Sequence, residues 1–368
     1  MSRLHWGMFA GVLILIAAPL ISGAAPPTVP VREVSITNGP RSTTAGAPMD
    51  AHSGTILRAS DGFFYWYGET YACGFYWTDP STPYCGAQVY RSNDMVDWEG
   101  PWPLFDATSA AWQNLCMHQP STPGNGCFRP KVVFNKSTRL YVLWLNTPNF
   151  TADGYRVLTS PNPTGPFTPA AKPELHDEGI PDWRGNPHAA DGDEALFVDG
   201  KGIAWLVWSR GGRLLQERLN SGYTTGAGAP AVIMNYPQLA PWGGVESPSE
   251  FAHDGRYYIA MSLPRCPYCA GTGTAIEQAT APGGPWTYQG TVSPDSCGGQ
   301  PNEVDQLAPG VLLWSSDRWL QGGAAGNWPR LNETKATQQW EVITFDEMDV
   351  APIVCASSFN LVFRGGSV

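Results

Sequence analysis

The chain has 368 residues, with 32 Asp and Glu against 22 Lys and Arg, and a formal net charge of −10. This excess of negative charge argues against nucleic acid and anionic membranes as partners, and it is compatible with neutral substrates such as sugars. With 41 Gly, 34 Pro and 16 Trp, the chain is rich in turns and aromatic residues, and long amphipathic helices are hard to find.

The first residues have the features of a secretory signal peptide. Arg3 supplies a positive charge, an apolar run extends over Gly7–Ile21, and the small residues Ser22–Ala24 fit a cleavage site. The apolar run is short for a membrane anchor, and no second stretch approaches its length. We therefore expect residues 1–24 to be a signal peptide, residues 25–45 to be an N-terminal tail, and the protein to be secreted and extracellular.

All eight cysteines follow the predicted signal peptide, and an even number in an exported chain indicates disulfides. We expect the pairs Cys73–Cys85 and Cys116–Cys127, which are close in sequence. Cys266 and Cys269 could pair with each other or with Cys297 and Cys355. A redox or zinc motif is the alternative for Cys266 and Cys269, but no helical pattern and no second such pair accompany them.

Three N-glycosylation sequons are present, and they permit glycosylation if the host is eukaryotic. In a bacterium they would be accidental. They begin at Asn135, Asn149 and Asn332.

Five segments repeat one pattern, which is an apolar strand, a turn and an aromatic-rich strand. Three of the turns contain Asp-Gly, at Asp61, Asp199 and Asp254, and this dipeptide between apolar runs is a strong hairpin signal. The turns recur at intervals of 55 to 76 residues. The segments are Gly54–Glu69, Pro130–Asn146, Glu194–Ser209, Ser249–Ser262 and Asp305–Asp317.

A second pattern follows three of these hairpins, at Tyr90–Gly100, Thr159–Pro169 and Ala279–Gly290. Each of these segments predicts a strand, a Pro/Gly turn and an outer strand, so each repeat is expected to contain four strands. Five such repeats predict an all-β fold, a single five-bladed β-propeller over residues 46–368. An array of β-sandwiches would explain the strands but not the single period.

In a propeller, the innermost strands line a central channel, and the residues at their starts converge on one face. Polar residues precede the first strand of every repeat, which indicates a pocket rather than isolated loop charges. They are Asp50 and His52; Arg129 and Lys131; His188, Asp191, Asp193 and Glu194; Glu246; and Gln300, Glu303 and Asp305.

With these motifs in view, the sequence resembles glycoside hydrolase family 43. The segments "SNDMVDW", "SPNPTGPF" and "TAPGGPW" and the "ESP" that opens the fourth repeat carry this resemblance. The motifs "AHSG", "DGFFYWYGE", "RPKVVFN", "ESPSEF", "GGQP" and "SDRW" are similar to its exo-β-1,3-galactanase subgroup. The similarity extends from His52 to Trp340. It implies a secreted, exo-acting and inverting hydrolase of β-1,3-galactan, the backbone of arabinogalactan.

The resemblance also implies roles for individual residues. Glu246 matches the general acid, and Gln300 matches a glutamine near the hydrolytic water. Asp193 matches an acidic position that contacts the sugar, and Glu69 matches a residue that holds the terminal galactose. An inverting mechanism needs a second group that activates water. Gln300 could orient this water while Glu303 or Asp305 accepts its proton, although for each of these carboxylates singly a place in a blade-entry turn is the favoured interpretation.

Three further residues are candidates for substrate binding: His52, Arg129 and Asp317. Arg129 could bind sugar hydroxyls through its forked donors or form an ion pair between blades. His52 could contact the substrate or lie satisfied in the channel. Asp317 belongs to the "SDRW" motif. The partner we expect is an oligosaccharide or polysaccharide bound by a monomer, with no nucleic acid, membrane, metal or cofactor involved.

The sequence departs from the family pattern in two places. No aspartate occupies the start of the first blade, near Ser53 and Gly54, and the galactanase subgroup shares this feature. The subgroup usually has a glutamate just before "RPK", where this chain has Phe128. Phe128 keeps two alternatives open: another activity of the family, such as arabinofuranosidase or xylosidase, and a non-catalytic propeller that binds carbohydrate.

Overall fold

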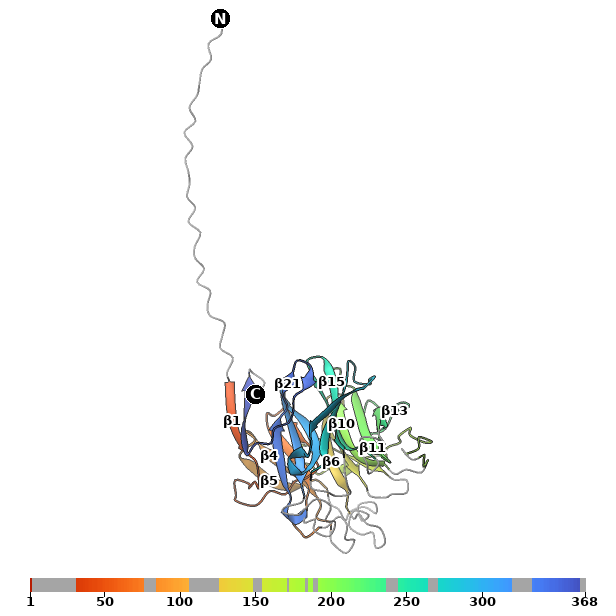
Figure 1. Ribbon diagram of the computed structural model, residues 1–368. Helices are drawn as coiled ribbons and strands as arrows, with labels where there is room; N and C mark the ends of the chain where they lie inside the picture. Colours follow the sequence, from red (N-terminus) through yellow and green to blue (C-terminus); the bar gives the residue numbers. More distant parts are fainter. Residues whose placement is uncertain are drawn as a thin grey trace.

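The computed structural model describes residues 1, 31–75, 84–105, 126–147, 154–170, 172–182, 185–187, 191–235, 244–263, 271–319 and 333–364. These residues form a five-bladed β-propeller, which confirms the predicted fold class (Figure 1). Neighbouring strands within each blade are antiparallel. Apart from strands, the described residues contain two short 3₁₀ turns, η1 (Ser296–Gly298) and η3 (Glu333–Lys335).

Each blade begins at the centre of the molecule, and its strands follow one another in chain order. Blade one contains β2 (Ile56–Arg58), β3 (Phe64–Glu69), β4 (Ala87–Ser92) and β5 (Trp98–Pro103). Blade two contains β6 (Phe128–Asn135), β7 (Leu140–Asn146), β8 (Tyr155–Ser160) and β9 (Thr168–Pro169). Blade three contains β10 (Asp191–Val198), β11 (Ala204–Arg210), β12 (Arg213–Arg218) and β13 (Ala231–Asn235). Blade four contains β14 (Glu246–His253), β15 (Arg256–Leu263), β16 (Gly273–Ala279) and β17 (Thr287–Ser293). Blade five contains β18 (Gln300–Ala308), β19 (Val311–Arg318) and β20 (Thr337–Val342).

The predicted Asp-Gly turns join the two inner strands of blades one, three and four. Gly62 (φ 88°) and Gly255 (φ 77°) take the left-handed conformation that such turns require. In the third turn, Gly202 (φ 78°) rather than Gly200 is the left-handed residue, and the side chain of Asp199 accepts hydrogen bonds from the backbone of Lys201 and Ile203.

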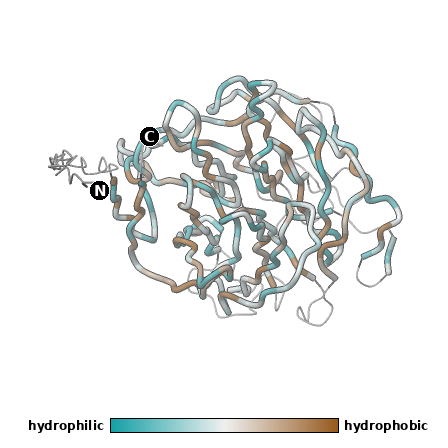
Figure 2. Tube along the Cα trace, turned by 90° about the horizontal axis from the view of Figure 1, so that it is seen from above, coloured by the Kyte–Doolittle hydropathy of each residue, from teal (hydrophilic) through white to brown (hydrophobic). Residues whose placement is uncertain are grey.

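The hydrophobic core consists of five clusters, and each lies between two adjacent blades. One joins blades one and two, through residues such as Tyr67 and Leu143. Equivalent clusters lie at the other four junctions. In the view from above, most hydrophobic segments lie inside the molecule (Figure 2). Because the inner strands of each blade are buried on both faces, their sequences are runs of apolar and aromatic residues rather than strict alternations of apolar and polar residues.

Blade five corrects the expectation of four strands per blade, because its described sheet has three. The outer edge of β20 is covered by Asn38, whose amide oxygen accepts from the Trp340 N–H (2.8 Å) and whose amide nitrogen donates to the Trp340 carbonyl (2.8 Å). Next to it, β1 (Val31–Thr37) pairs with β23 (Ser358–Arg364), so the first and the last strand of the described fold lie side by side (Figure 1). Between blade five and β23 lies the small hairpin β21 (Phe345–Asp346) and β22 (Asp349–Val350).

Two disulfides are described, Cys73–Cys85 and Cys297–Cys355. The first confirms a prediction, and the second rules out the pairing of Cys297 and Cys355 with Cys266 and Cys269. Cys127 is also disulfide-bonded. Cys116, Cys266 and Cys269 lie outside the described residues, so their pairings stay predictions.

The sequon at Asn135 is not accessible in the folded protein. Asn135 is fully buried, and its amide donates to the Ser221 carbonyl and accepts from Ser137 and Thr138. Asn149 and Asn332 lie outside the described residues, so their glycosylation stays a prediction.

Candidate active site

The inner strands of blades two to five all begin with a break in strand register. These β-bulges lie between Phe128 and Lys131, Asp191 and Glu194, Glu246 and Ser249, and Pro301 and Glu303. A bulge bends the strand and redirects its side chains. Because the five inner strands surround one axis, the redirected side chains meet above the channel. Polar residues at the five strand openings are thus brought together, as the sequence predicts.

Two of the bulged residues have strained backbones. Arg129 and Ser247 have φ angles of 53° and 50°, a left-handed conformation that is uncommon outside glycine. Ser53 at the opening of blade one has a φ of 56°. Such conformations persist where surrounding contacts hold them, and they are concentrated at functional sites.

Glu246 is the first residue of β14, and Gln300 is the first residue of β18. The Gln300 Nε2 atom donates to Oε2 of Glu246 at 3.2 Å. Desolvation by surrounding protein atoms, together with the charge of Asp193, raises the pKa of Glu246 to about 7, against the opposing effect of Arg129 and the Gln300 hydrogen bond. The side chain nevertheless remains open to solvent. Glu246 is therefore a carboxyl enclosed by protein that a ligand can still reach.

Arg129 joins four blades. Its Nε atom pairs with Oδ1 of Asp193 (2.7 Å) in blade three. Its Nη2 atom donates to Oγ of Ser247 (2.5 Å) in blade four and to Oε1 of Gln300 (2.8 Å) in blade five. Burial alone would lower the pKa of Arg129, but Asp193 raises it above its usual value. Of the two interpretations of Arg129, the structure supports the ion pair between blades.

Both oxygens of Asp193 are engaged by protein groups. Oδ1 binds Arg129, and Oδ2 accepts from the backbone N–H (3.1 Å) and the hydroxyl (3.0 Å) of Ser247. Ser247 directly follows Glu246, so Asp193 holds the backbone that carries the Glu246 side chain. The sequence reasoning missed Ser247, although its place directly after the candidate acid was a usable signal.

Glu69 ends β3 in blade one. It is 2% exposed, and its Oε1 accepts from the Tyr71 hydroxyl (2.8 Å). Among the described residues, its Oε2 has no hydrogen-bond partner, since the nearby Ser53 hydroxyl donates to Asp317 instead. Burial raises the pKa of Glu69 to about 8, although Tyr71 and Arg129 oppose this shift. A buried carboxyl oxygen without a partner costs free energy, and a sugar hydroxyl would satisfy it.

His52 forms a β-bridge with Glu69 and lies between two carboxylates. Its Nδ1 atom is 3.1 Å from Oδ1 of Asp317, and its Nε2 atom is 3.2 Å from Oδ1 of Asp50. Burial alone would lower the pKa of His52, but hydrogen bonds and ion pairs with Asp317 and Asp50 raise it to about 9. Imidazolium is therefore the expected form at neutral pH.

Asp317 is fully engaged in holding blade one against blade five. Besides His52, it accepts from the Ser53 N–H (2.7 Å), the Ser53 hydroxyl (2.9 Å) and the Gln338 amide (2.9 Å). Burial favours the neutral form, yet these donors lower the pKa of Asp317 below its usual value. Since Asp317 is opposite Gln300 in the β18–β19 pairing, the two halves of the candidate site are adjacent.

Phe128 opens β6, at the position that Glu246 and Gln300 occupy in their blades. A row of rings connects it to His52: His52 stacks on Tyr71 (4.5 Å between centroids), Tyr71 on Phe75 (5.6 Å), and Phe75 lies 6.1 Å from Phe128. The Cys73–Cys85 disulfide ties this segment to the residues just before β4. The described part of this aromatic segment thus lies beside the site, while residues 76–83 are outside the described residues.

The carboxylates considered as proton acceptors lie deeper in the channel. Glu303 pairs with Lys131 (2.7 Å) and accepts a hydrogen bond from Ser249. Lys131 has no solvent exposure and also donates to the side chain of Asn302 (3.0 Å). Asp305, further along β18, is buried too. These contacts disfavour both Glu303 and Asp305 as the partner of a water bound at Gln300.

The described residues contain neither a candidate metal site nor a candidate membrane-spanning helix. No group of three or more His, Cys, Asp or Glu side chains there could hold a metal ion. In the same residues, no helix has the length and apolar character needed to cross a membrane.

Several solved structures share this fold. An exo-β-1,3-galactanase from Clostridium thermocellum superposes with a TM-score of 0.69 at 24% identity, over 88% of this chain and 66% of that chain. An exo-β-1,3-galactanase from Phanerochaete chrysosporium, solved with galactose, gives 0.66 at 23% identity, over 89% of this chain and 68% of that chain. A GH43 β-1,3-galactosidase with galactodeoxynojirimycin gives 0.68 at 20% identity, over 86% of this chain and 98% of that chain.

These likenesses establish the fold, and the chain spans about two thirds of the length of the two galactanases. No curated protein sequence matches this chain. A family sequence profile does match, over residues 55–307. This match covers the inner strands of all five blades, and the chain therefore belongs to the glycosyl hydrolases family 43.

Proposed function

We propose that this protein is a secreted glycosidase that removes galactose from the end of β-1,3-galactan with inversion of configuration, acting as a monomer. The observation that carries the proposal is the contact between Glu246 and Gln300 at the openings of blades four and five, beside Arg129 of blade two and Asp193 of blade three. One carboxyl there has a pKa suited to proton donation, and one amide beside it is suited to holding water.

Glu246 acts as the general acid in this proposal. With a pKa raised to about 7, it holds a proton at mildly acidic pH and is open to a ligand. Its proton goes to the glycosidic oxygen as the bond to the anomeric carbon breaks, which neutralises the leaving group. Asp193 supports this role by its negative charge, which opposes ionisation of Glu246.

Gln300 orients the attacking water, whose oxygen bonds to the anomeric carbon while the proton that it loses passes to solvent water. Its amide oxygen is fixed by Arg129, and one N–H is directed at Glu246. No described residue accepts from the second N–H of this amide, so it is free to hold a water molecule. Because Arg129 is itself fixed by Asp193 and Ser247, the amide is preorganised, which is the condition under which positioning contributes most to a rate.

Glu69 binds the terminal sugar, and His52, whose two ring nitrogens are held by Asp317 and Asp50, supports it from the neighbouring position of the β-bridge. Oε2 of Glu69 is buried and has no partner among the described residues, and the raised pKa of this group allows it to donate as well as accept at neutral pH. Asp317 and Arg129 act as positioning residues, since the described contacts of both are with protein groups that fix His52 and Gln300.

The proposed substrate and the proposed secretion are supported by different observations. The structures with a similar fold include exo-β-1,3-galactanases and a β-1,3-galactosidase, one of them with bound galactose. Secretion is supported by the apolar run over Gly7–Ile21 and by the described disulfides, which persist in oxidising compartments.

The test is a comparison of substrates and variants. The purified protein is incubated with de-branched β-1,3-galactan, arabinan and xylo-oligosaccharides, and the anomer released first is identified by NMR. We expect galactose from galactan only, released as the α-anomer, and a loss of about 10³-fold or more in Glu246→Gln. Glu99→Gln, a change at a carboxyl on the outer strand β5 whose side chain is 53% exposed, is the matched control. Release of β-galactose would overturn inversion.

Phe128 supports a second candidate. An aromatic ring occupies the opening of blade two, where the resemblance implies a glutamate, so another family activity on arabinan or xylan is the alternative. Release of arabinose or xylose in place of galactose would favour it. Binding of galactan without turnover would instead indicate a non-catalytic carbohydrate-binding propeller.

A further inference from the structure

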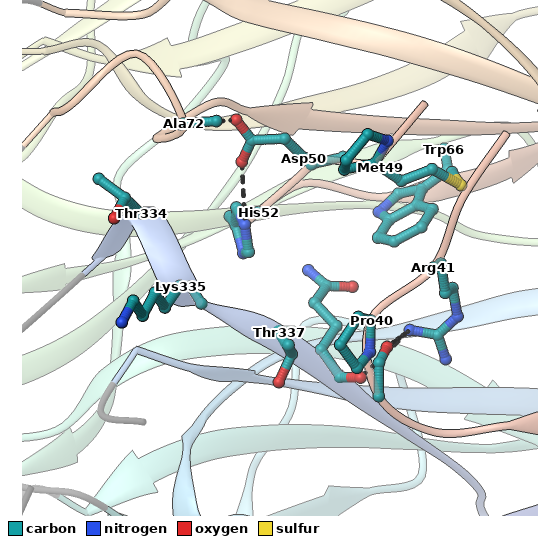
Figure 3. A pocket seen from close by; sticks show the side chains of 15 residues that line it. Pro40, Arg41, Met49, Asp50, His52, Trp66, Ala72, Thr334, Lys335 and Thr337 are labelled. Atoms are coloured by element: carbon teal, nitrogen blue, oxygen red, sulfur yellow. Dashed lines mark hydrogen bonds and ion pairs between the residues drawn. The ribbon is translucent and has the colours of Figure 1, made fainter. Parts of the chain in front are cut away.

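A cavity of about 320 Å³ lies next to the candidate site, between the segment that leads into blade one and the start of β20 (Figure 3). Its walls include Arg41, His52, Trp66, Lys335 and Gln338. The volume is at the lower end of the range for small-molecule sites. Because His52 also forms the β-bridge with Glu69, the cavity lies beside the residue that is proposed to bind the terminal sugar.

The charge of this cavity is opposite to that of the protein. Arg41, His52 and Lys335 are basic lining residues, while Asp50 is the one acidic residue among them; the whole chain has a net charge of −10. Asp50 is already engaged by the backbone N–H groups of Tyr71 and Ala72 and by His52 (Figure 3). Asp317, behind His52, is held by donors from Ser53 and Gln338.

Arg41 is a half-buried cation without a carboxylate partner among the described residues. Its guanidinium lies 3.7 Å from the ring centroid of Trp340 and donates only to neutral oxygens, of which the Gln338 carbonyl (3.2 Å) and Oδ1 of Asn38 (3.3 Å) are the nearest. Five N–H groups are available on a guanidinium, so donors remain. Burial lowers the pKa of Arg41 to about 9, as expected for a cation that lacks a counter-charge.

Lys335 lies at the rim, across the cavity from Arg41 (Figure 3). It is exposed, and no carboxylate in the described parts of the chain pairs with it. A flexible lysine at the rim and a fixed arginine on the wall are suited to an anionic group that enters from solvent. Pro40 and Met49 add apolar lining to the cavity, which is suited to a sugar ring rather than to a small inorganic ion.

We propose that this cavity binds a carboxylate-bearing sugar unit of the substrate, with Arg41 and Lys335 as its specificity-determining residues. The proposal rests on the proposed function, because it assigns an acidic substituent to the glycan that the neighbouring site hydrolyses. A neutral galactan would still reach Glu246, since neither basic residue contacts Glu246 or Gln300 in the described structure.

The test uses direct binding, which is independent of turnover. Methyl β-glucuronide and its neutral counterpart methyl β-glucoside are titrated into the full-length protein by calorimetry, with sodium acetate as a third ligand. We expect the glucuronide to bind about fivefold more tightly than the glucoside, a preference that about 0.5 M NaCl reduces. Acetate should bind more weakly than the glucuronide, because it lacks the ring.

Two variants locate the effect. Arg41→Met and Lys335→Gln should each reduce the preference for the glucuronide and leave hydrolysis of neutral galactan unchanged. Lys335 is exposed, so Lys335→Gln keeps the test valid even if Arg41→Met fails to fold. Equal affinities for the two glycosides, a preference that persists in Lys335→Gln, or acetate binding as tight as glucuronide binding would each overturn the proposal. Absence of galactan hydrolysis with an intact preference would instead contradict the proposed function alone.

Discussion

Ser247 donates both its backbone N–H and its hydroxyl to one oxygen of Asp193, Oδ2, at 3.1 and 3.0 Å. The two residues come from adjacent blades, and Ser247 directly follows the candidate acid Glu246. The double contact holds Ser247 at a φ of 50°, and it thereby sets the direction in which Glu246 leaves the strand.

Replacing Ser247 tests this coupling. Ser247→Ala removes the hydroxyl that bonds to both Asp193 and Arg129 and keeps the left-handed backbone, so we expect a loss of about 1–3 kcal/mol in unfolding free energy and a clear fall in kcat. Ser247→Gly removes the same hydroxyl but relieves the backbone, so it should be more stable than the alanine variant. Urea unfolding and kinetics on galactan measure the two effects.

Ser249→Ala is the matched control, since Ser249 lies on the same strand but contacts Glu303 in the channel. It should lower stability without changing the pH dependence of kcat/KM. A Ser247→Ala protein with the kinetics of the wild type would show that the contact with Asp193 does not position Glu246.

The pH dependence of activity follows from the surroundings of Glu246. Its pKa is raised to about 7 by desolvation and by the charge of Asp193, and in the proposed mechanism the protonated form is the active one. Activity should therefore fall as pH rises through about 7. Asp193→Asn removes the negative charge and leaves the Arg129 cation uncompensated, and both changes favour ionised Glu246. The alkaline limb of kcat/KM should move to lower pH.

Residual activity of Asp193→Asn, measured across pH and scaled to its maximum, gives the position of this limb. Asp97→Asn, at an exposed aspartate, should keep the wild-type profile. An alkaline limb that stays in place in Asp193→Asn would exclude charge coupling between Asp193 and Glu246.

The sequence predicted those parts of the fold that depend on local pattern. Asp-Gly turns between apolar runs specify hairpins within a few residues, and the recurrence of five hairpin segments, three of them with such a turn, indicated five blades. The edge of blade five could not be predicted in this way, because Asn38 and Trp340 are 302 positions apart. In the site, the sequence pattern placed Glu246 and Gln300 at the openings of two successive blades, and the two side chains are in contact in the structure. The linking role of Arg129 depends on contacts from three other blades, which no local pattern encodes.

Stability should depend on pH through His52. Burial opposes its charge, but Asp317 and Asp50 raise its folded pKa from 6.5 to about 9. Because the folded pKa is the higher one, this stabilisation is fully present below about pH 6.5 and is lost as pH rises through 9. The raised pKa of His52 contributes on the order of 3 kcal/mol to the free energy of unfolding. Asp317→Asn should lower stability at pH 6 far more than at pH 9.5.

Urea unfolding at the two pH values measures this difference. Asp346→Asn, at an exposed aspartate of the hairpin β21–β22, serves as the control and should leave the free energy of unfolding unchanged at both pH values. If Asp317→Asn lost the same stability at both pH values, the ion pair with His52 would not be the source of the effect.

The two described disulfides should differ in what they contribute. Cys297–Cys355 closes a loop with a sequence separation of 58, whereas Cys73–Cys85 closes one of 12. If a disulfide acts by restricting the unfolded chain, the longer loop contributes about 4 kcal/mol and the shorter about 3 kcal/mol. The pair Cys297→Ser/Cys355→Ser should therefore lower the free energy of unfolding more than Cys73→Ser/Cys85→Ser.

The effects of the two disulfides on activity should follow their position rather than their loop length. Cys297 lies three residues before Gln300, and Cys73 lies between Tyr71 and Phe75, in the row of rings beside His52. Loss of the first pair should lower kcat through Gln300, and loss of the second should raise KM through the sugar-binding wall. The opposite order of stabilities would show that native-state contacts, rather than loop entropy, dominate both bonds.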